Sequence, residues 1–318
     1  MNWARFLFIA LPLALFSLAA LAEGVALALG GVPLRRHDLD TIVVALDRAK
    51  LDAPIVIAGD SVTQDALKTY QVAPPGKIAN LTTNEASGLI GTAFLLRRYL
   101  NRNAPPRHLV IASTPEFYAY HPDGVAAQVY VTSVFQKTDE KAELARLNIG
   151  GHESWWPAVL MIQERVWDKL TSSVTPAVTE LPVGGVKPEP TGLEAVLVPP
   201  RLAAELTKRT EMKLDLSLSA RRAFELICAD SARYGFTLHL IRGPVPETVL
   251  VAWGSTENFN AQLRAATAGC GAVVIEDINS RQVFPDYAFR DPDHLRRAGW
   301  TALYGRLLAE YVGNLMDR

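Results

Sequence analysis

The chain has 318 residues, of which 32 are basic and 33 acidic, so its formal net charge at pH 7 is −1. This balance excludes the basic excess of nucleic-acid-binding proteins and the long charged tails of many interaction proteins. The length suits one large domain or two modest domains with a buried core. Hydrophobic residues make up 49% of the chain, a share that the N-terminus inflates.

The N-terminal segment is apolar from Phe6 to Ala22, and beyond Glu23 the apolar run continues to Leu29. A signal anchor needs roughly 20 apolar residues, which this stretch supplies if Glu23 lies near the membrane interface. The alternative is a cleavable signal peptide, since Ala20-Leu21-Ala22 fits a cleavage site. We expect the anchor, and both interpretations place the rest of the chain outside the cytoplasm. The expected location is a single-pass inner-membrane protein with a periplasmic domain, or a periplasmic or secreted protein after cleavage.

Helical periodicity starts at Leu39, and the first apolar strand starts at Ile55 and runs into Gly59-Asp60-Ser61. Further along, the pattern predicts strands over 108–112, 236–241 and 272–277, and helices over 39–50, 84–100, 137–147, 219–234, 258–268 and 293–316. Residues 171–192 read as a long loop, and 207–216 as a hairpin or part of a loop. Alternating helices and short apolar strands indicate an α/β layered fold around a mainly parallel sheet.

The expected organisation is an anchor or signal peptide with its juxtamembrane segment over 1–36 and one domain over 37–318, with an irregular insertion at about 117–216. The two cysteines, Cys228 and Cys270, fit either a disulfide of an exported protein or two buried thiols.

Four polar or small residues directly follow expected strands. In a parallel sheet the site lies beyond the carboxyl ends of the strands, so their loops are expected to share one edge. These residues are Ser61, Thr114, Gly243 and Asn279.

Ser61 is the strongest candidate for chemistry, because it lies where a strand turns into a helix. A serine hydroxyl becomes a good nucleophile only when a base takes its proton, and a carboxylate usually orients that base. The turn exposes Oγ, and the helix N-terminus offers N–H groups to a developing oxyanion. Alternation along the strand turns Asp60 away, so we expect Asp60 to bind loop backbone.

Among the six histidines, His294 has the best context for a base, since Asp291 lies three residues before it at the start of the expected final helix. A carboxylate and an imidazole at that spacing can lie side by side. Asp293 is a helix-start residue or, in a shifted register, the acid. The remaining histidines have weaker contexts: His121 as a turn or groove residue, His152 with Trp155 and Trp156 as a glycan-binding, membrane-surface or packing patch, and His37, His108 and His239 as structural residues.

Gly59-Asp60-Ser61 near the start of the domain and Asp291-x-x-His294 near its end resemble the SGNH/GDSL hydrolase superfamily, over about residues 55–304. The resemblance implies a flavodoxin-like three-layer sandwich, ester or acyl chemistry, and Ser61 as nucleophile with His294 as base and Asp291 as its orienter. The stretch from Phe284 to Gly299 is similar to the exported, membrane-tethered branch that acylates cell-envelope polymers. That branch includes alginate O-acetylation proteins and the D-alanyl transfer proteins of teichoic acids.

Two blocks depart from the superfamily pattern. No glycine clearly occupies the expected oxyanion position in 80–88, where Asn84 or nearby backbone could substitute. The expected Gly-x-Asn-Asp block is replaced by residues 112–116, so that Thr114 and Glu116 could line the site. The polymer-acylating branch departs at the same two blocks.

The resulting expectation is an exported serine acyl-transfer enzyme that moves O-acetyl groups to or from a cell-envelope or extracellular polysaccharide through a Ser61 acyl-enzyme. A general periplasmic esterase or lipase, or a non-catalytic scaffold of an envelope assembly, is the alternative. Expected partners are an acyl ester or acetyl donor, a glycan acceptor, the membrane and a multi-spanning acyl-exporting membrane protein, with no nucleic acid. No His/Asp/Glu cluster has metal-ligand spacing, so we expect no metal and no cofactor.

Overall fold

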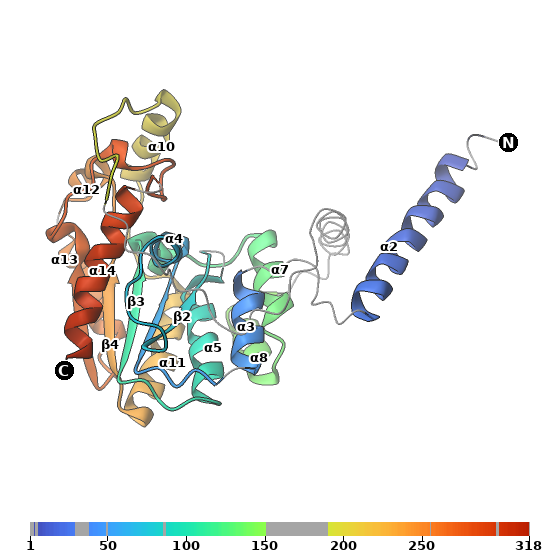
Figure 1. The fold of residues 1–318 in the computed structure, drawn as a ribbon, viewed down its shortest axis with the longest axis horizontal. Helices are drawn as coiled ribbons and strands as arrows, with labels where there is room; N and C mark the ends of the chain where they lie inside the picture. The colour runs from blue at the N-terminus through green and yellow to red at the C-terminus, as the bar shows by residue number, and fades with distance from the viewer. Residues whose placement is uncertain are drawn as a thin grey trace.

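The computed structural model describes residues 3, 6–28, 38–48, 50–84, 87–150, 190–254, 256–296 and 299–317. Within them the chain is an α/β protein whose five-stranded sheet is entirely parallel, in the order β2-β1-β3-β4-β5 (Figure 1). The strands are β1 (Ile55–Gly59), β2 (Ile78–Thr82), β3 (His108–Ser113), β4 (Thr237–Arg242) and β5 (Ala272–Asp277).

Helices connect the strands and cover both faces of the sheet (Figure 1). The longer ones are α3 (Asp38–Arg48), α4 (Ser61–Thr69), α5 (Gly88–Leu100), α7 (Val125–Val134), α8 (Thr138–Arg146), α10 (Pro200–Thr210), α11 (Leu218–Tyr234), α13 (Glu257–Ala266) and α14 (Trp300–Met316). Shorter ones are α6 (Pro115–Ala119), α12 (Glu247–Trp253) and the 3-10 turns η3 (Ile278–Ser280) and η4 (Asp286–Ala288).

The two faces of β1 contribute to two separate apolar cores. Val56 and Ala58 pack in the core that includes residues of α3, α5 and α11, whereas Ile55 and Ile57 pack against residues of α4 and α14. All of β1 is buried, which explains why it reads as a continuous apolar run rather than an alternating one. A central strand buried on both faces gives the loop that follows it a rigid support.

Helix α14 packs directly against α4, the helix that begins with the candidate nucleophile Ser61. A Cβ added at Gly305 would lie 2.5 Å from the Cβ of Tyr70 and 3.1 Å from the carbonyl oxygen of Ala66. Only a residue without a side chain allows this approach. The same pair of helices is joined by Tyr304, whose hydroxyl lies 3.1 Å from Oγ1 of Thr63.

The sequence prediction of an α/β fold around a parallel sheet is confirmed, and four of the five strands were expected. Strand β2 and the helices α6, α7 and α12 were not expected. Residues 207–216 were expected as a hairpin or part of a loop, which is wrong for 207–210, because α10 continues to Thr210, whereas 211–216 lie in a loop as expected. Its apolar side chains Leu202 and Leu206 pack against Val245 and Val249, so tertiary contacts stabilise the helix. The described parts of the insertion at 117–216 are largely helical, and most of the expected loop at 171–192 lies outside the described residues.

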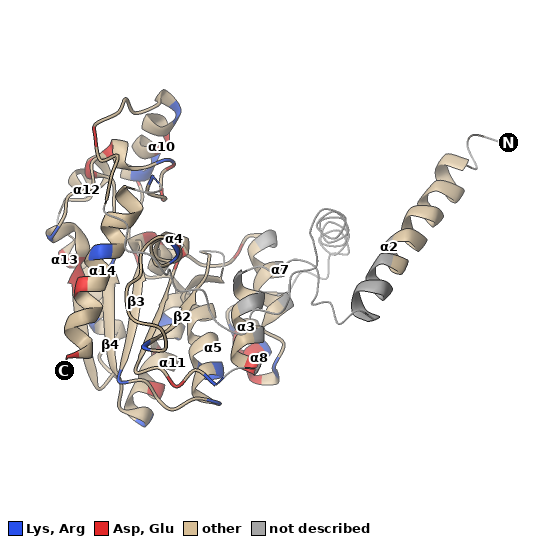
Figure 2. Cartoon of the chain, viewed as in Figure 1, with Lys and Arg blue, Asp and Glu red and all other residues tan. Residues whose placement is uncertain are grey.

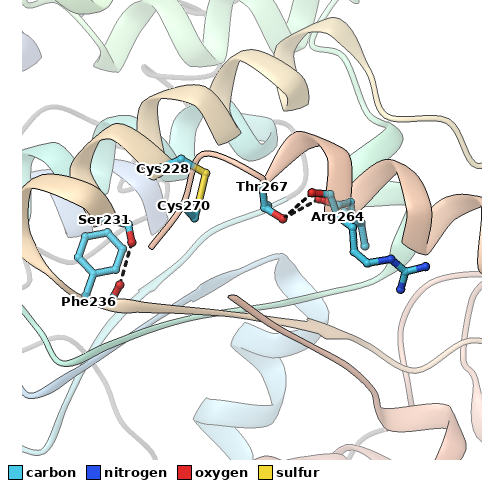
Figure 3. The surroundings of a disulfide bond; sticks show 7 residues. Cys228, Ser231, Phe236, Arg264, Thr267 and Cys270 are labelled. Atoms are coloured by element: carbon cyan, nitrogen blue, oxygen red, sulfur yellow. Dashed lines mark hydrogen bonds between the residues drawn. A yellow bond between two sulfur atoms is a disulfide. The ribbon is translucent and has the colours of Figure 1, made fainter. Parts of the chain in front are cut away.

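Cys228 and Cys270 form a disulfide, so of the two open alternatives the buried free thiols are wrong (Figure 3). The bond spans 42 residues and connects α11 with the turn between α13 and β5. Ser231 reinforces the same region by donating a hydrogen bond to the carbonyl oxygen of Phe236 at 2.8 Å. The disulfide thus ties the start of edge strand β5 to α11, and the Ser231 bond ties the start of β4 to the same helix.

The N-terminal segment forms the short π-helix η1 (Phe6–Ala10) and helix α2 (Leu11–Ala28). Within the part of the chain that the structure describes, no helix has both the length and the apolar character needed to cross a membrane. The expected anchor, and the alternative of a cleaved signal peptide, stay predictions.

Candidate active site

The turn after β1 is shaped by a close approach to β3. A Cβ added at Gly59 would lie 1.9 Å from the carbonyl oxygen of Ala112, so only glycine fits there. Beyond Gly59, the N–H of Asp60 donates to Oγ of Ser113 at 3.1 Å. The end of β3 therefore determines the path of the chain at the point where α4 begins with Ser61.

Asp60 is buried and accepts four hydrogen bonds. Its Oδ1 accepts from the N–H groups of Val62 and Thr63, each at 3.1 Å, and Oδ2 accepts from the N–H and Oγ1 of Thr114 at 2.7 and 2.9 Å. Burial raises the pKa of Asp60, whereas the bonds from Thr114 and Thr63 act in the opposite direction. Asp60 thus caps α4 and ties it to the loop after β3, which confirms the expected binding to loop backbone.

Ser61, His294 and Asp291 lie in one hydrogen-bonded line. Oγ of Ser61 is 2.8 Å from Nε2 of His294, and Nδ1 of His294 is 2.9 Å from Oδ1 of Asp291. Ser61 and His294 are 233 residues apart in the sequence. The structure therefore brings together the three residues that the sequence singled out, in the arrangement of a nucleophile, a base and an orienting carboxylate.

The segment that carries Asp291 and His294 is a turn and not the start of the final helix, so that expectation was wrong. Oδ1 of Asp291 accepts from the N–H groups of Asp293 and His294 at 3.0 and 2.8 Å. An aspartate that bonds to the backbone after it offers the chain an alternative to a helix. An antiparallel bridge between Phe289 and Leu295 closes the turn, and α14 begins only at Trp300.

The electrostatics of the pair favour an ionised Asp291. Burial would raise the pKa of this carboxyl group, but the hydrogen bonds from the ring and the backbone of His294 outweigh it and lower the pKa to about 2. An ionised carboxylate only accepts, so Nδ1 of His294 carries the proton and Nε2 of the neutral ring faces the Ser61 hydroxyl. The same hydrogen bond to Asp291 raises the pKa of His294.

Asp293 does not replace Asp291 as the partner of the ring. Its carboxylate instead lies 3.6 Å from Nη1 of Arg209, and its own N–H donates to Asp291. The acid of the candidate triad is therefore Asp291, and Asp293 faces away toward α10.

The expected oxyanion donors are only partly available. The N–H groups of Val62 and Thr63 donate to Asp60, so these two are occupied. No described residue accepts a hydrogen bond from the N–H of Ser61, which leaves that group for a substrate oxygen.

The two remaining residues proposed for the site lie on neighbouring loops. The N–H of Thr83 donates to the carbonyl oxygen of Gly59 at 2.9 Å, which places Asn84 on the loop beside that of Ser61. The role of Asn84 as an oxyanion donor stays a prediction. The buried Thr114 donates through its N–H and its hydroxyl to Asp60, so it supports the turn.

The loops that follow the strands share one edge of the sheet, as the sequence predicted. Hydrogen bonds between backbone and amide groups connect them. The N–H of Gly243 donates to the carbonyl oxygen of Ser113 at 2.7 Å, and Nδ2 of Asn279 donates to the carbonyl oxygen of Gly243 at 2.9 Å. The loops after β3, β4 and β5 therefore form one continuous layer beside the Ser61 turn.

Two arginines that the sequence analysis did not single out hold the His294 turn. Arg290 pairs with Asp65 of α4 at 3.1 Å and lies 3.5 Å from Oδ2 of Asp291. Arg209 of α10 donates to the carbonyl oxygen of Pro292. Arg290 could have been noticed from its position next to Asp291, whereas nothing in the local sequence links residue 209 to residue 292.

The other histidines lie elsewhere. His108 and His239 bond to each other at 3.1 Å, and His239 bonds to the hydroxyl of Tyr311 at 2.8 Å, as expected of structural residues. His121 is half-buried after α6. His37 and the patch at residues 152–156 lie outside the described residues. Among the described residues, no group of three His, Cys, Asp or Glu side chains is arranged to hold a metal ion.

No model of a known protein family matches this chain, and a search of curated proteins finds no significant match.

Proposed function

We propose that this protein is an exported serine acyl-transfer enzyme that moves O-acetyl groups to or from a cell-envelope or extracellular polysaccharide. The observation that carries the proposal is the line from Ser61 Oγ to His294 Nε2, at 2.8 Å, and from His294 Nδ1 to Asp291 Oδ1, at 2.9 Å. These distances are within the range at which a base takes the proton of a nucleophile.

In the proposed reaction Ser61 Oγ forms a bond to the carbonyl carbon of an acyl ester while Nε2 of His294 takes the hydroxyl proton. The bond from that carbon to the donor alcohol breaks, and the alcohol oxygen takes the proton from His294. An acceptor hydroxyl then attacks the acyl-enzyme and gives its proton to His294. The released Ser61 oxygen takes that proton back, so the enzyme returns to its starting state.

The proposed fold is the flavodoxin-like three-layer sandwich of the SGNH/GDSL hydrolases. The parallel strand order β2-β1-β3-β4-β5, with helices on both faces, supports it. The position of Ser61 directly after the second strand of that order, beside the loops after β2 and β3, supports it as well.

The proposed location is the outer side of the inner membrane, with the N-terminal helix as anchor. Large apolar side chains of this segment are strongly exposed, including Phe8 at 80% and Phe16 at 71%, which favours an apolar environment around them. The Cys228–Cys270 disulfide supports an oxidising compartment. The proposed partners are an acetyl donor, a glycan acceptor and a multi-spanning membrane protein that exports acyl groups.

An acetyl-transfer assay tests the proposal. The purified protein is given 4-nitrophenyl acetate as donor together with neutral and acidic oligosaccharides, and both the release of nitrophenolate and the mass of the sugars are followed. Sugars that gain an acetyl group, with both signals lost in Ser61→Ala, are the expected result. Release of acetate without acetylated sugars would favour the plain esterase. Equal rates for the wild type and Ser61→Ala would overturn the catalytic role of Ser61.

A further inference from the structure

Helix α10 carries a buried arginine that contacts three other segments. The side chain of Arg209 is 4% exposed, and its Nε pairs with Oε1 of Glu116. Its Nη1 donates to the carbonyl oxygen of Pro292, and its Cζ lies 5.8 Å from the centre of the Trp253 ring. A charged group is rarely buried without partners, and here every contact is to a different part of the chain.

Two of these partners belong to the candidate active site. Pro292 lies between Asp291 and His294, so a bond to its carbonyl acts on the turn that carries the base. Glu116 lies two residues beyond Thr114, which binds Asp60 at the start of the Ser61 helix. Arg209 therefore connects the loop that supports the nucleophile with the turn that carries the base.

We propose that Arg209 is a positioning residue, which holds the Asp291–His294 turn at the distance that proton transfer from Ser61 requires. The inference rests on the proposed function, because it assigns Arg209 a role in the reaction of the same site. Helix α10 belongs to the insertion between β3 and β4. The insertion therefore contributes a residue to the candidate active site at the carboxyl edge of the sheet.

The chemistry of the guanidinium group suits this role. Its planar fork donates in fixed directions, so one side chain binds the carboxylate of Glu116 and the carbonyl of Pro292 at once. A misplacement of about 1 Å at a reacting group can cost about 100-fold in rate. A lysine retains the charge but lacks the fork, so Arg209→Lys is expected to preserve the pairing with Glu116 and release the turn.

The fold contains a second arginine with nearly the same environment, far from the site. Arg98 of α5 is buried, pairs with Glu140 at 2.7 Å and donates to the carbonyl oxygen of Val134 at 3.3 Å. Its Cζ lies 5.7 Å from the centre of the Phe135 ring. Each arginine also has a second carboxylate nearby. Nη1 of Arg98 lies 3.6 Å from the carboxylate of Asp47, and Nη1 of Arg209 lies 3.6 Å from the carboxylate of Asp293. Figure 1 shows α8, which carries Glu140, at the opposite end of the domain from α10.

The test compares two double variants, Arg209→Met with Glu116→Gln and Arg98→Met with Glu140→Gln. Each removes a whole buried ion pair, so no charge is left buried and unpaired. Both proteins are treated with a fluorophosphonate, in which the serine oxygen bonds to phosphorus, fluoride leaves and the base takes the proton. The rate constant and the final fraction of labelled protein are measured by intact mass, and the melting temperature is measured in parallel.

We expect the Arg209 pair variant to label about 10- to 100-fold more slowly than the wild type, with complete final labelling, and the Arg98 pair variant to label at the wild-type rate. Arg209→Lys is expected to be slow as well. A merely structural role would instead lower the final fraction and the melting temperature and leave the rate constant of the folded molecules unchanged. That result, or equal rates in both double variants, would overturn the inference.

The labelling experiment also distinguishes a wrong role of Arg209 from a wrong proposed function. If Ser61 is not a nucleophile, the wild type itself is not labelled at Ser61. If only the role of Arg209 is wrong, the wild type and the Arg209 pair variant are labelled at the same rate. Should the double variant be unstable, Arg209→Lys supplies the same comparison with the charge retained.

Discussion

Asp291 holds His294 at two points, because its Oδ1 accepts from both the backbone N–H and the ring Nδ1 of that residue, at 2.8 and 2.9 Å. One carboxylate oxygen thus shapes the turn and orients the imidazole. The ring depends on a local turn of a few residues for its orientation, and that turn is held from outside by Arg290 and Arg209. Asp291 therefore orients the ring of the candidate base and raises its pKa, while the two arginines hold the turn in place.

The substitution Asp291→Asn is expected to reduce the rate of ester hydrolysis about 10³- to 10⁴-fold, because a neutral amide no longer stabilises the protonated ring. The initial rate with 4-nitrophenyl acetate at saturating donor measures the effect. Asp293→Asn is the matched control, since the Asp293 carboxylate lies toward Arg209 and makes no described bond to the ring. An equal loss in the two variants would contradict the assignment of Asp291.

The pH dependence follows from the raised pKa of His294, whose main cause is the hydrogen bond to Asp291. The base works only when neutral, so the labelling rate should rise with pH, with a midpoint above the ordinary 6.5. In Asp291→Asn the midpoint should fall. A group with a raised pKa in the folded state stabilises the protein at low pH, and this contribution is lost as the pH rises through that pKa. A midpoint below 6.5 in the wild type would be inconsistent with the pair.

Asp60→Asn is expected to lower the free energy of unfolding by about 2 kcal/mol, because the new NH₂ group faces the buried N–H of Thr114 and leaves that donor unpaired. Urea unfolding measures the loss. Asp286→Asn is the control, since Asp286 binds the N–H and Oγ1 of Thr248 in the same way at the surface. There water replaces the lost bonds, so the expected loss is below about 0.5 kcal/mol. Similar losses at both positions would show that burial of Asp60 does not determine its contribution.

Removal of the disulfide by Cys228→Ala with Cys270→Ala is expected to lower the free energy of unfolding by about 2–4 kcal/mol, because the unfolded chain regains the freedom of a loop of 42 residues. Denaturant unfolding under oxidising conditions measures the difference. The chain has two cysteines, so the unfolded wild type should take up iodoacetamide only after reduction. Alkylation without reduction would contradict the pairing.

Much of the fold could be predicted from the sequence, because a buried parallel strand is a short apolar run. Strand β2 was not predicted, since Asn80 and Thr82 interrupt its apolar run. Oδ1 of Asn80 accepts from the N–H and Oγ1 of Thr82, so these polar groups satisfy each other inside an edge strand. The two polar residues that make the strand unrecognisable by hydrophobicity are thus hydrogen-bonded to each other.

The triad residues could be singled out because each sits in a short motif, but the contacts that hold them could not. Arg209 and Pro292 are 83 residues apart, and α10, which carries Arg209, packs against residues of α12 and the loop before it. The charged residues of both signs are interspersed along the chain in Figure 2, and local sequence does not indicate which of them become buried pairs. Long-range ion pairs depend on the packing of whole helices, which periodicity alone does not specify.

The most direct test of the central claim is fluorophosphonate labelling followed by mapping of the modified peptide by mass spectrometry. The account predicts one covalent adduct per molecule, located on Ser61, that forms slowly in His294→Ala and is absent from Ser61→Ala. No adduct on the folded wild type, or an adduct that persists in Ser61→Ala, would contradict it.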